Sequence, residues 1–129
     1  RASTQTAALE DVKDASAIIT NPTHFAVAIK YEVGKEGAPI ILAMGRGMMA
    51  EKIISLAEDA QITIFQSPLL ARAIYFTGEI GKEISENLYS AIASVLAYIF
   101  KIERGEESDY PEFDVPDEMN FDEYGKNIK

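Results

Sequence analysis

The sequence predicts an α/β fold: a small mixed β-sheet of about four strands flanked by helices. Short apolar runs of strand length alternate along the chain with longer segments in which apolar residues recur every three or four positions. Glycines and prolines separate these segments, as is typical of turns. The chain has 129 residues, 47 % of them hydrophobic, which is enough for one domain with a buried core.

The predicted elements are, in order, a helix, three strands, a helix, a strand and two helices. They span residues 1–14, 17–20, 25–33, 40–44, 48–59, 62–65, 68–76 and 88–101. Leu9 and Val12 lie at helical spacing within the first, alanine-rich segment. Alternating apolar residues from Phe25 onwards predict a strand that gathers them on one face, whereas the unbroken apolar run from Ile40 predicts burial on both faces.

Glycine and proline delimit the later helices. Gly45-Arg46-Gly47 ends the third strand, and the helix that follows carries apolar residues at periods of three and four. Because this helix separates the third strand from the fourth, we expect a right-handed crossover with those two strands parallel. Pro68 takes the first position of the next helix, Gly78 ends it, and Ser85 is a candidate N-cap for the last one.

The turn between the first two strands has the sequence Asn21-Pro22-Thr23-His24, which allows an unusual reaction. Asparagine usually cyclises when the next backbone nitrogen attacks its side chain, but proline has no N–H for that route. The Asn21 side-chain nitrogen can instead attack its own main-chain carbonyl carbon, with the Pro22 nitrogen as leaving group. This reaction cuts the chain between Asn21 and Pro22. Most Asn-Pro steps are inert turns, because both residues favour turn conformations.

Two interpretations of His24 are open. Histidine is the side chain that exchanges protons near neutral pH, so His24 could carry a proton to the Pro22 nitrogen or polarise the scissile carbonyl. Alternatively, it only bonds within the turn and fixes its shape. We expect Thr23 to bond the backbone of the turn, and Thr20 to be a strand residue rather than a reactant. The candidate catalytic residues are therefore Asn21, Pro22, Thr23 and His24.

Other segments between about residues 9 and 100 accompany this turn. They are Asp11-Val12-Lys13-Asp14-Ala15, Val27-Ala28-Ile29-Lys30-Tyr31, Ala38-Pro39 and Ser67-Pro68-Leu69-Leu70-Ala71-Arg72-Ala73-Ile74-Tyr75. Together with the Asn-Pro-Thr-His turn, they closely resemble the FlhB/YscU family of self-cleaving switch proteins of type III secretion. The Val-Pro-Asp-Glu run at residues 115–118 is more similar to flagellar members of the family than to injectisome members.

The resemblance implies the cytoplasmic domain of a flagellar type III export apparatus protein. Such a domain would cleave itself once, without a cofactor, and so switch export from hook- and rod-type to filament-type substrates. The resemblance also implies a membrane-embedded portion before Arg1 and a location at the cytoplasmic face of the bacterial inner membrane. Its implied partners are other export-apparatus proteins and exported substrates or their chaperones.

Cleavage would leave pieces 1–21 and 22–129, which we expect to stay associated because the first strand is apolar. Two alternatives are open. An injectisome homologue would perform the same cleavage but export different proteins. A non-cleaving α/β interaction module would use the Asn-Pro step only as a turn.

Charge is unevenly distributed along the chain, whose net charge is −9. Residues 1–102 carry 9 basic and 11 acidic side chains, whereas residues 103–129 carry 3 and 10. No basic face is available for nucleic acid, and one histidine without cysteine argues against a zinc site. We therefore predict a connector helix over residues 1–15, a self-cleaving domain over 16–102 and a flexible acidic tail over 103–129.

Three further features have two interpretations each. Gly45-Arg46-Gly47 could seat an anion in a nucleotide-responsive regulator, but it lacks phosphate-loop spacing and is otherwise a strand-to-helix turn. Arg72 could contact a partner or form a surface ion pair. The tail could dock into a partner groove through five apolar residues, Phe113, Val115, Met119, Phe121 and Tyr124.

Overall fold

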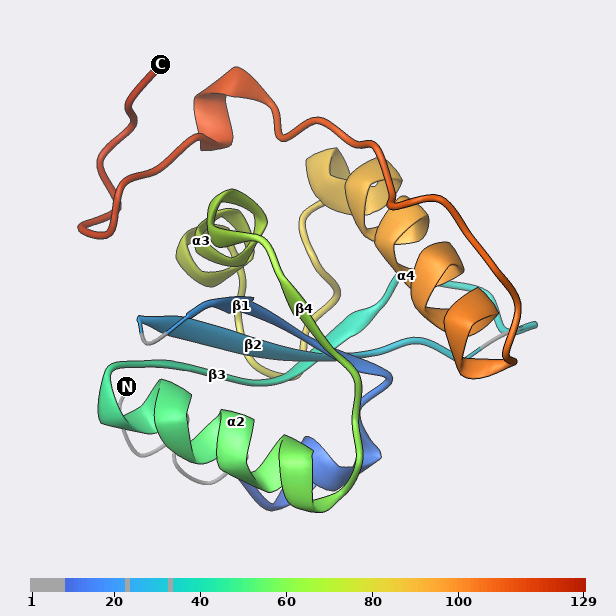
Figure 1. Cartoon of the computed structure of the whole chain (residues 1–129). Helices are drawn as coiled ribbons and strands as arrows, with labels where there is room; N and C mark the ends of the chain where they lie inside the picture. Colours follow the sequence, from blue (N-terminus) through green and yellow to red (C-terminus); the bar gives the residue numbers. More distant parts are fainter. Residues whose placement is uncertain (1–8, 23, 33) are drawn as a thin grey trace.

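The computed structural model describes residues 9–22, 24–32 and 34–129, which contain a four-stranded sheet in the order β3-β2-β1-β4 (Figure 1). β1 (Ala17–Asn21) pairs antiparallel with β2 (Phe25–Lys30), and β2 pairs antiparallel with β3 (Ile40–Arg46). β4 (Ile64–Gln66) pairs parallel with β1. The sheet is therefore mixed, as predicted. β3 and β4 run in the same direction, but β2 and β1 lie between them.

Helices cover both faces of this sheet (Figure 1). α3 (Pro68–Thr77) and α4 (Tyr89–Glu103) pack on one face. α2 (Met48–Asp59) packs on the other, beside the 3-10 helix η1 (Leu9–Asp14). Two separate apolar cores result, one on each side of the sheet.

The alternation along β2 explains how one strand serves both cores. Phe25, Val27 and Ile29 face α3 and α4, as the sequence pattern predicted for one face. Ala26 and Ala28 face α2, and all five side chains are fully buried. The small alanine side chains leave room for the helix to pack close to the sheet.

Element boundaries differ from the predictions at several strand ends and at the first helix. β2 ends at Lys30 rather than at residue 33, and β4 spans Ile64–Gln66 rather than residues 62–65. Pairing extends β1 to Asn21 and β3 to Arg46, because Asn21 pairs with Phe25 and Phe25 pairs with Arg46. The predicted first helix is described only over residues 9–14, where it has 3-10 form. Ser85 precedes a short 3-10 helix, η2 (Glu86–Leu88), rather than α4 itself. No helix among the described residues has the length and hydrophobicity needed to cross a bilayer.

The acidic C-terminal segment runs back along α4 and past α3 (Figure 1). It includes a third 3-10 helix, η3 (Asp117–Met119). Four of its five candidate docking residues pack on the core of this same chain: Phe113, Val115, Met119 and Phe121. The fifth, Tyr124, is 78 % exposed. The flexibility of residues 103–129 stays a prediction, but most of the apolar groups proposed for a partner groove have partners within the chain.

Candidate functional site

The Asn-Pro turn joins the two central strands of the sheet. The β1–β2 ladder continues to its last pair, Asn21 with Phe25, so the connection spans only residues 22–24. The His24 main-chain N–H donates a hydrogen bond of 2.9 Å to the Asn21 carbonyl oxygen, which closes a tight turn as predicted. Thr23, a predicted site residue, lies outside the described residues.

Each end of this turn is anchored in the fold. Thr20 is buried, and its carbonyl oxygen accepts a hydrogen bond of 2.9 Å from the Ser67 N–H at the start of α3. Phe25 is fully buried, with its ring centroid 4.8 Å from that of Tyr75 and 5.5 Å from that of Phe76. The turn is thus held between two immobilised strand ends, which limits the conformations open to Asn21 and Pro22.

The hydrogen bond from His24 has chemical significance because its acceptor is the carbonyl that cyclisation would attack. As a nucleophile adds to a carbonyl carbon, negative charge develops on the oxygen. A main-chain N–H already at 2.9 Å stabilises that charge without reorganisation. Losing one such donor costs about 3 kcal/mol of barrier in enzymes with oxyanion holes.

His24 itself has further contacts among the described residues. Its carbonyl oxygen accepts a hydrogen bond of 3.0 Å from the Gly47 N–H at the start of α2. Its ring Nδ1 lies 3.2 Å from the Pro22 carbonyl oxygen, and its Nε2 lies 3.6 Å from Glu123 Oε2. The ring thus contacts a carbonyl within the turn, which favours the interpretation in which it fixes the shape of the turn. Proton transfer by His24 stays a prediction.

Gly47 has a backbone conformation that suits this contact. Its φ of 59° lies in the left-handed region, which glycine adopts without steric cost. Neighbouring Arg46 places its guanidinium 4.9 Å from the centroid of the Phe25 ring and donates a hydrogen bond of 2.9 Å to the Glu123 carbonyl oxygen. The guanidinium of Arg46, in the Gly45-Arg46-Gly47 segment, therefore contacts the main chain of the acidic tail.

Arg72 also contacts the tail. Its Nε donates a hydrogen bond of 2.6 Å to the Phe121 carbonyl oxygen. The sequence left open a partner contact or a surface ion pair for this arginine, and the structure shows a bond to the main chain of the same molecule. Arg72 and Phe121 are 49 residues apart along the chain, so no local pattern indicates this bond.

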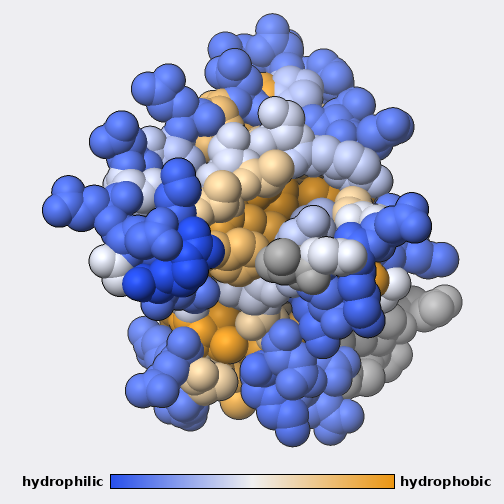
Figure 2. All heavy atoms as spheres, turned by 90° about the vertical axis from the view of Figure 1, so that its right-hand side faces the viewer, coloured by the Kyte–Doolittle hydropathy of each residue, from blue (hydrophilic) through white to orange (hydrophobic). Residues whose placement is uncertain are grey.

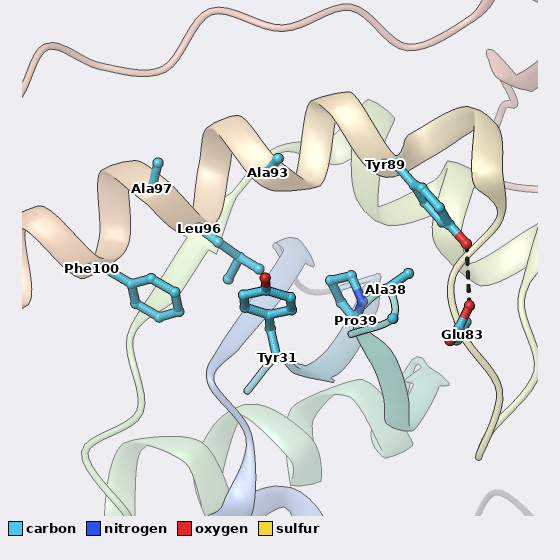
Figure 3. Close-up of a pocket in the computed structure, with 10 residues that line it drawn as sticks. Tyr31, Ala38, Pro39, Glu83, Tyr89, Ala93, Leu96, Ala97 and Phe100 are labelled. Carbon is cyan, nitrogen blue, oxygen red and sulfur yellow. Dashed lines mark hydrogen bonds between the residues drawn. The ribbon is translucent and has the colours of Figure 1, made fainter. Parts of the chain in front are cut away.

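A second feature, which the sequence analysis missed, is an apolar pocket of about 650 Å³ between α4 and the segment that connects β2 to β3. Figure 2 views the molecule from the right-hand side of Figure 1, where α4 ends and the β2–β3 connection lies. It shows a hollowed apolar area flanked by hydrophilic residues. Tyr31, Pro39 and Phe100 line the pocket together with Ala93 and Leu96 (Figure 3). Ala93 and Ala97 lie four residues apart on α4 and are exposed beside buried Leu96. This pair of small residues was the sequence feature that could have indicated a pocket.

The rim of this pocket carries a polar pair. The Tyr89 hydroxyl donates a hydrogen bond of 3.2 Å to Glu83 Oε1 (Figure 3). Desolvation raises the pKa of Tyr89, and its hydrogen bond to Glu83 raises the pKa further. The pocket therefore has an apolar floor and one acidic edge.

The family model that matches this chain is one of bacterial export proteins. The chain belongs to the family described as "FlhB HrpN YscU SpaS Family", which matches residues 1–99. This family membership agrees with the resemblance drawn from the sequence.

Curated relatives include flagellar biosynthetic proteins named FlhB. The protein of Salmonella typhimurium is 38 % identical over 127 residues, which cover 94 % of this chain and 33 % of the relative. That of Aquifex aeolicus is 45 % identical over 91 residues, which cover 70 % of this chain and 26 % of the relative. The chain thus spans about a quarter to a third of the length of these relatives.

Solved structures show the same fold. The cytoplasmic domain of FlhB from Shewanella putrefaciens has a TM-score of 0.81 and 35 % sequence identity, and the match covers 91 % of this chain and 95 % of that one. A mutated EscU C-terminal domain has a TM-score of 0.67 and 27 % identity, covering 71 % of this chain and 98 % of that one.

Proposed function

We propose that this chain is the cytoplasmic domain of a flagellar type III export protein that cuts itself between Asn21 and Pro22. The cut would switch export from hook- and rod-type to filament-type substrates. The observation that carries the proposal is the hydrogen bond of 2.9 Å from the His24 N–H to the carbonyl oxygen of an Asn-Pro step. The names of the FlhB relatives support the flagellar assignment. The solved FlhB relative is described as a cytoplasmic domain, which supports the proposed location at the cytoplasmic face of the bacterial inner membrane.

The reaction needs no group from outside the turn. The Asn21 side-chain nitrogen attacks the Asn21 main-chain carbonyl carbon, and the bond from that carbon to the Pro22 nitrogen breaks. The attacking nitrogen loses a proton, and the Pro22 nitrogen gains one. The products are a C-terminal succinimide on residues 1–21 and a secondary amine at the start of residues 22–129.

The fold promotes this reaction by restricting the turn. An unfolded asparagine rarely places its side-chain nitrogen against its own carbonyl carbon. Paired strands on either side reduce the alternatives, and such preorganisation can contribute several kcal/mol. Any strain in a turn of three residues, typically about 1–3 kcal/mol per strained residue, would be released by the cut.

The cut would change a surface rather than the core. It would free residues 22–24 from β1 and place a charged amine at Pro22, while Phe25 stays buried below. Other export-apparatus proteins could distinguish these two surfaces, which makes the cut an irreversible signal.

We propose exported polypeptides as the partners of the apolar pocket. A cavity of about 650 Å³ with an apolar lining accepts bulky apolar side chains. It opens to solvent on the side shown in Figure 2, so an extended segment could insert one side chain without unfolding the domain. The proposed partner of the pocket is thus an exported substrate, and a chaperone of such a substrate is the alternative.

Mass spectrometry of the freshly synthesised chain tests the cleavage. We expect two species, residues 1–21 and 22–129, and a single intact species in Asn21→Ala. The same variant is then introduced into a flagellated host. Loss of filament assembly there would favour the flagellar protein over the injectisome alternative. An unmodified chain that stays intact for days at neutral pH would instead support the non-cleaving module.

A further inference from the structure

The last segment of the chain lies beside the proposed cleavage turn. We name residues 120–127 the strap. Figure 1 shows the C-terminal segment, in red, turning back above the end of the sheet where β1 and β2 are joined. Glu123 approaches the turn most closely, with Oε2 at 3.6 Å from His24 Nε2. The proposed function above makes no use of this contact.

The strap has a defined structure of its own. Phe121 pairs with Asn127 in an antiparallel bridge, and the Asp122 N–H donates a hydrogen bond of 2.8 Å to the Lys126 carbonyl oxygen. Asp122 Oδ1 accepts hydrogen bonds of 2.9 Å from the N–H groups of both Tyr124 and Lys126. These bonds close a small hairpin, so Glu123 sits at a defined place within it.

Helix α3 anchors this hairpin. The Phe121 ring packs against Phe76 at 5.6 Å between centroids, and Arg72 Nε donates to the Phe121 carbonyl oxygen at 2.6 Å. Gly125 lies so close to the Phe76 ring that a Cβ there would come within 2.9 Å of it. Because Phe76 also packs against Phe25, a line of aromatic rings connects the strap to the residue after the turn.

Arg46 also holds the strap. It donates a hydrogen bond of 2.9 Å to the Glu123 main-chain oxygen while its guanidinium lies over the Phe25 ring. This bond uses the backbone of Glu123, so the carboxylate is left to face His24. The His24 ring can donate from Nδ1 to the Pro22 carbonyl oxygen, while its Nε2 lies 3.6 Å from Glu123 Oε2.

We propose that the strap is an intramolecular clamp on the cleavage turn, in which Glu123 is the positioning residue for His24. Glu123 orients the His24 ring against the Pro22 carbonyl and thereby steadies the His24 N–H that donates to the Asn21 carbonyl oxygen. This role rests on the proposed self-cleavage. All of these strap contacts are made with residues that follow Pro22, so the clamp would persist on residues 22–129 after the cut.

The expected effect on rate is small because the pair is partly exposed. The His24 and Glu123 side chains are 55 % and 42 % exposed, so solvent screens their interaction. When the histidine is protonated, an exposed ion pair of this kind changes an equilibrium or a rate by about two- to five-fold. Glu123→Gln should therefore slow cleavage by about that factor, since it removes the charge and leaves the main-chain acceptor of Arg46 in place.

His24 makes a direct test possible because it is the only histidine in the chain. Its ring Cε1–Hε1 cross-peak in an NMR spectrum needs no assignment. The spectrum is recorded in an Asn21→Ala background, which keeps a single intact species, with and without Glu123→Gln. Glu118→Gln, an exposed acidic position elsewhere in the tail, is the matched control. In parallel, the intact fraction after cell-free synthesis of the chain with native Asn21 is followed over time.

We expect Glu123→Gln, and not Glu118→Gln, to move the His24 cross-peak and to slow cleavage two- to five-fold. An unchanged cross-peak, or an unchanged cleavage rate in a parent chain that cleaves, overturns the role of Glu123. If the parent chain never cleaves, the proposed function is refuted instead. In that case the effect of Glu123→Gln on the His24 cross-peak decides whether the strap holds His24. Deleting residues 120–129 gives a second variant, which should move the cross-peak further.

Discussion

At the scale of single residues, the carbonyl oxygen of Asn21 receives its hydrogen bond from a main-chain group, the His24 N–H. Every amino acid except proline supplies that donor, so the bond itself does not require histidine. What the histidine side chain adds is contact with the Pro22 carbonyl and with Glu123. Mutation of His24 can therefore separate the contribution of its side chain from that of its main-chain N–H.

His24→Ala is expected to slow cleavage by less than tenfold, because alanine retains the main-chain donor. A side chain that transferred the proton in the rate-limiting step would be worth about 10²- to 10⁴-fold. The measurement is the rate of appearance of residues 22–129 after cell-free synthesis, from pH 5 to 9. A loss of a hundredfold or more, together with a changed pH profile, would assign proton transfer to His24.

Asp122 is a second residue with a measurable property. Hydrogen bonds from the Lys126 and Tyr124 backbone, and the nearby charges of Lys126 and Arg72, lower the pKa of Asp122, although partial desolvation opposes them. A carboxylate whose folded pKa is lowered stabilises its site above its ordinary pKa of 3.8, and that stabilisation is lost as the pH falls through the lower value.

We therefore expect the strap hairpin to open on acidification, below about pH 4. The amide NMR signals of Tyr124 and Lys126 should shift together in that range, since both N–H groups donate to Asp122 Oδ1. Asp122→Asn, which cannot titrate, should lack the transition. A transition of equal size in Asp122→Asn would show that another acid is responsible.

At the scale of secondary structure elements, β1 holds the short piece that cleavage would create. β1 lies inside the sheet, antiparallel to β2 and parallel to β4. Ala17, Ile18 and Ile19 are fully buried. None of these interactions passes through the bond between Asn21 and Pro22.

Residues 1–21 and 22–129 should consequently co-elute in size-exclusion chromatography under native conditions. Burial of two isoleucine side chains alone contributes about 3–6 kcal/mol, in addition to ladder hydrogen bonds on both edges of β1. Denaturing electrophoresis of the same fraction should show both pieces. Elution of the short piece by itself, without denaturant, would contradict this expectation.

At the scale of the whole molecule, the pocket is formed by segments that are distant in sequence. Tyr31 and Pro39 come from the β2–β3 connection, whereas Ala93 and Ala97 come from α4 (Figure 3). The pocket and the turn occupy different places, so substrate contact and cleavage should respond to different mutations.

Ala93→Glu should weaken contact with exported polypeptides by about tenfold or more, because an unpaired charge enters an apolar lining. It should leave cleavage at Asn21 unchanged. Ser90→Glu, an exposed position on the same helix outside the pocket, is the control. Binding of an apolar peptide from an exported protein, measured by calorimetry, compares the two. Equal binding by both variants would remove the pocket from the proposal.

Periodicity and turn chemistry were sufficient to predict the order of the strands and the main helices along the chain. The Asn-Pro step predicts a cleavage site from local chemistry alone: proline removes the usual nucleophile, and asparagine supplies another. The mixed sheet was also predictable, since a helix between two strands constrains their directions.

Only the tertiary structure decided what surrounds the turn. The contacts of Arg72 with Phe121 and of Arg46 with Glu123 join residues 49 and 77 positions apart. They depend on where an irregular tail crosses the fold, which no periodic pattern encodes. Composition predicted a flexible acidic tail, which stays a prediction. A count of charges does not show that Phe113, Val115, Met119 and Phe121 pack on the core of their own chain. The Asn-Pro-Thr-His motif is thus a property of the sequence, whereas the tail contacts around the turn and the apolar pocket are properties of the packed molecule.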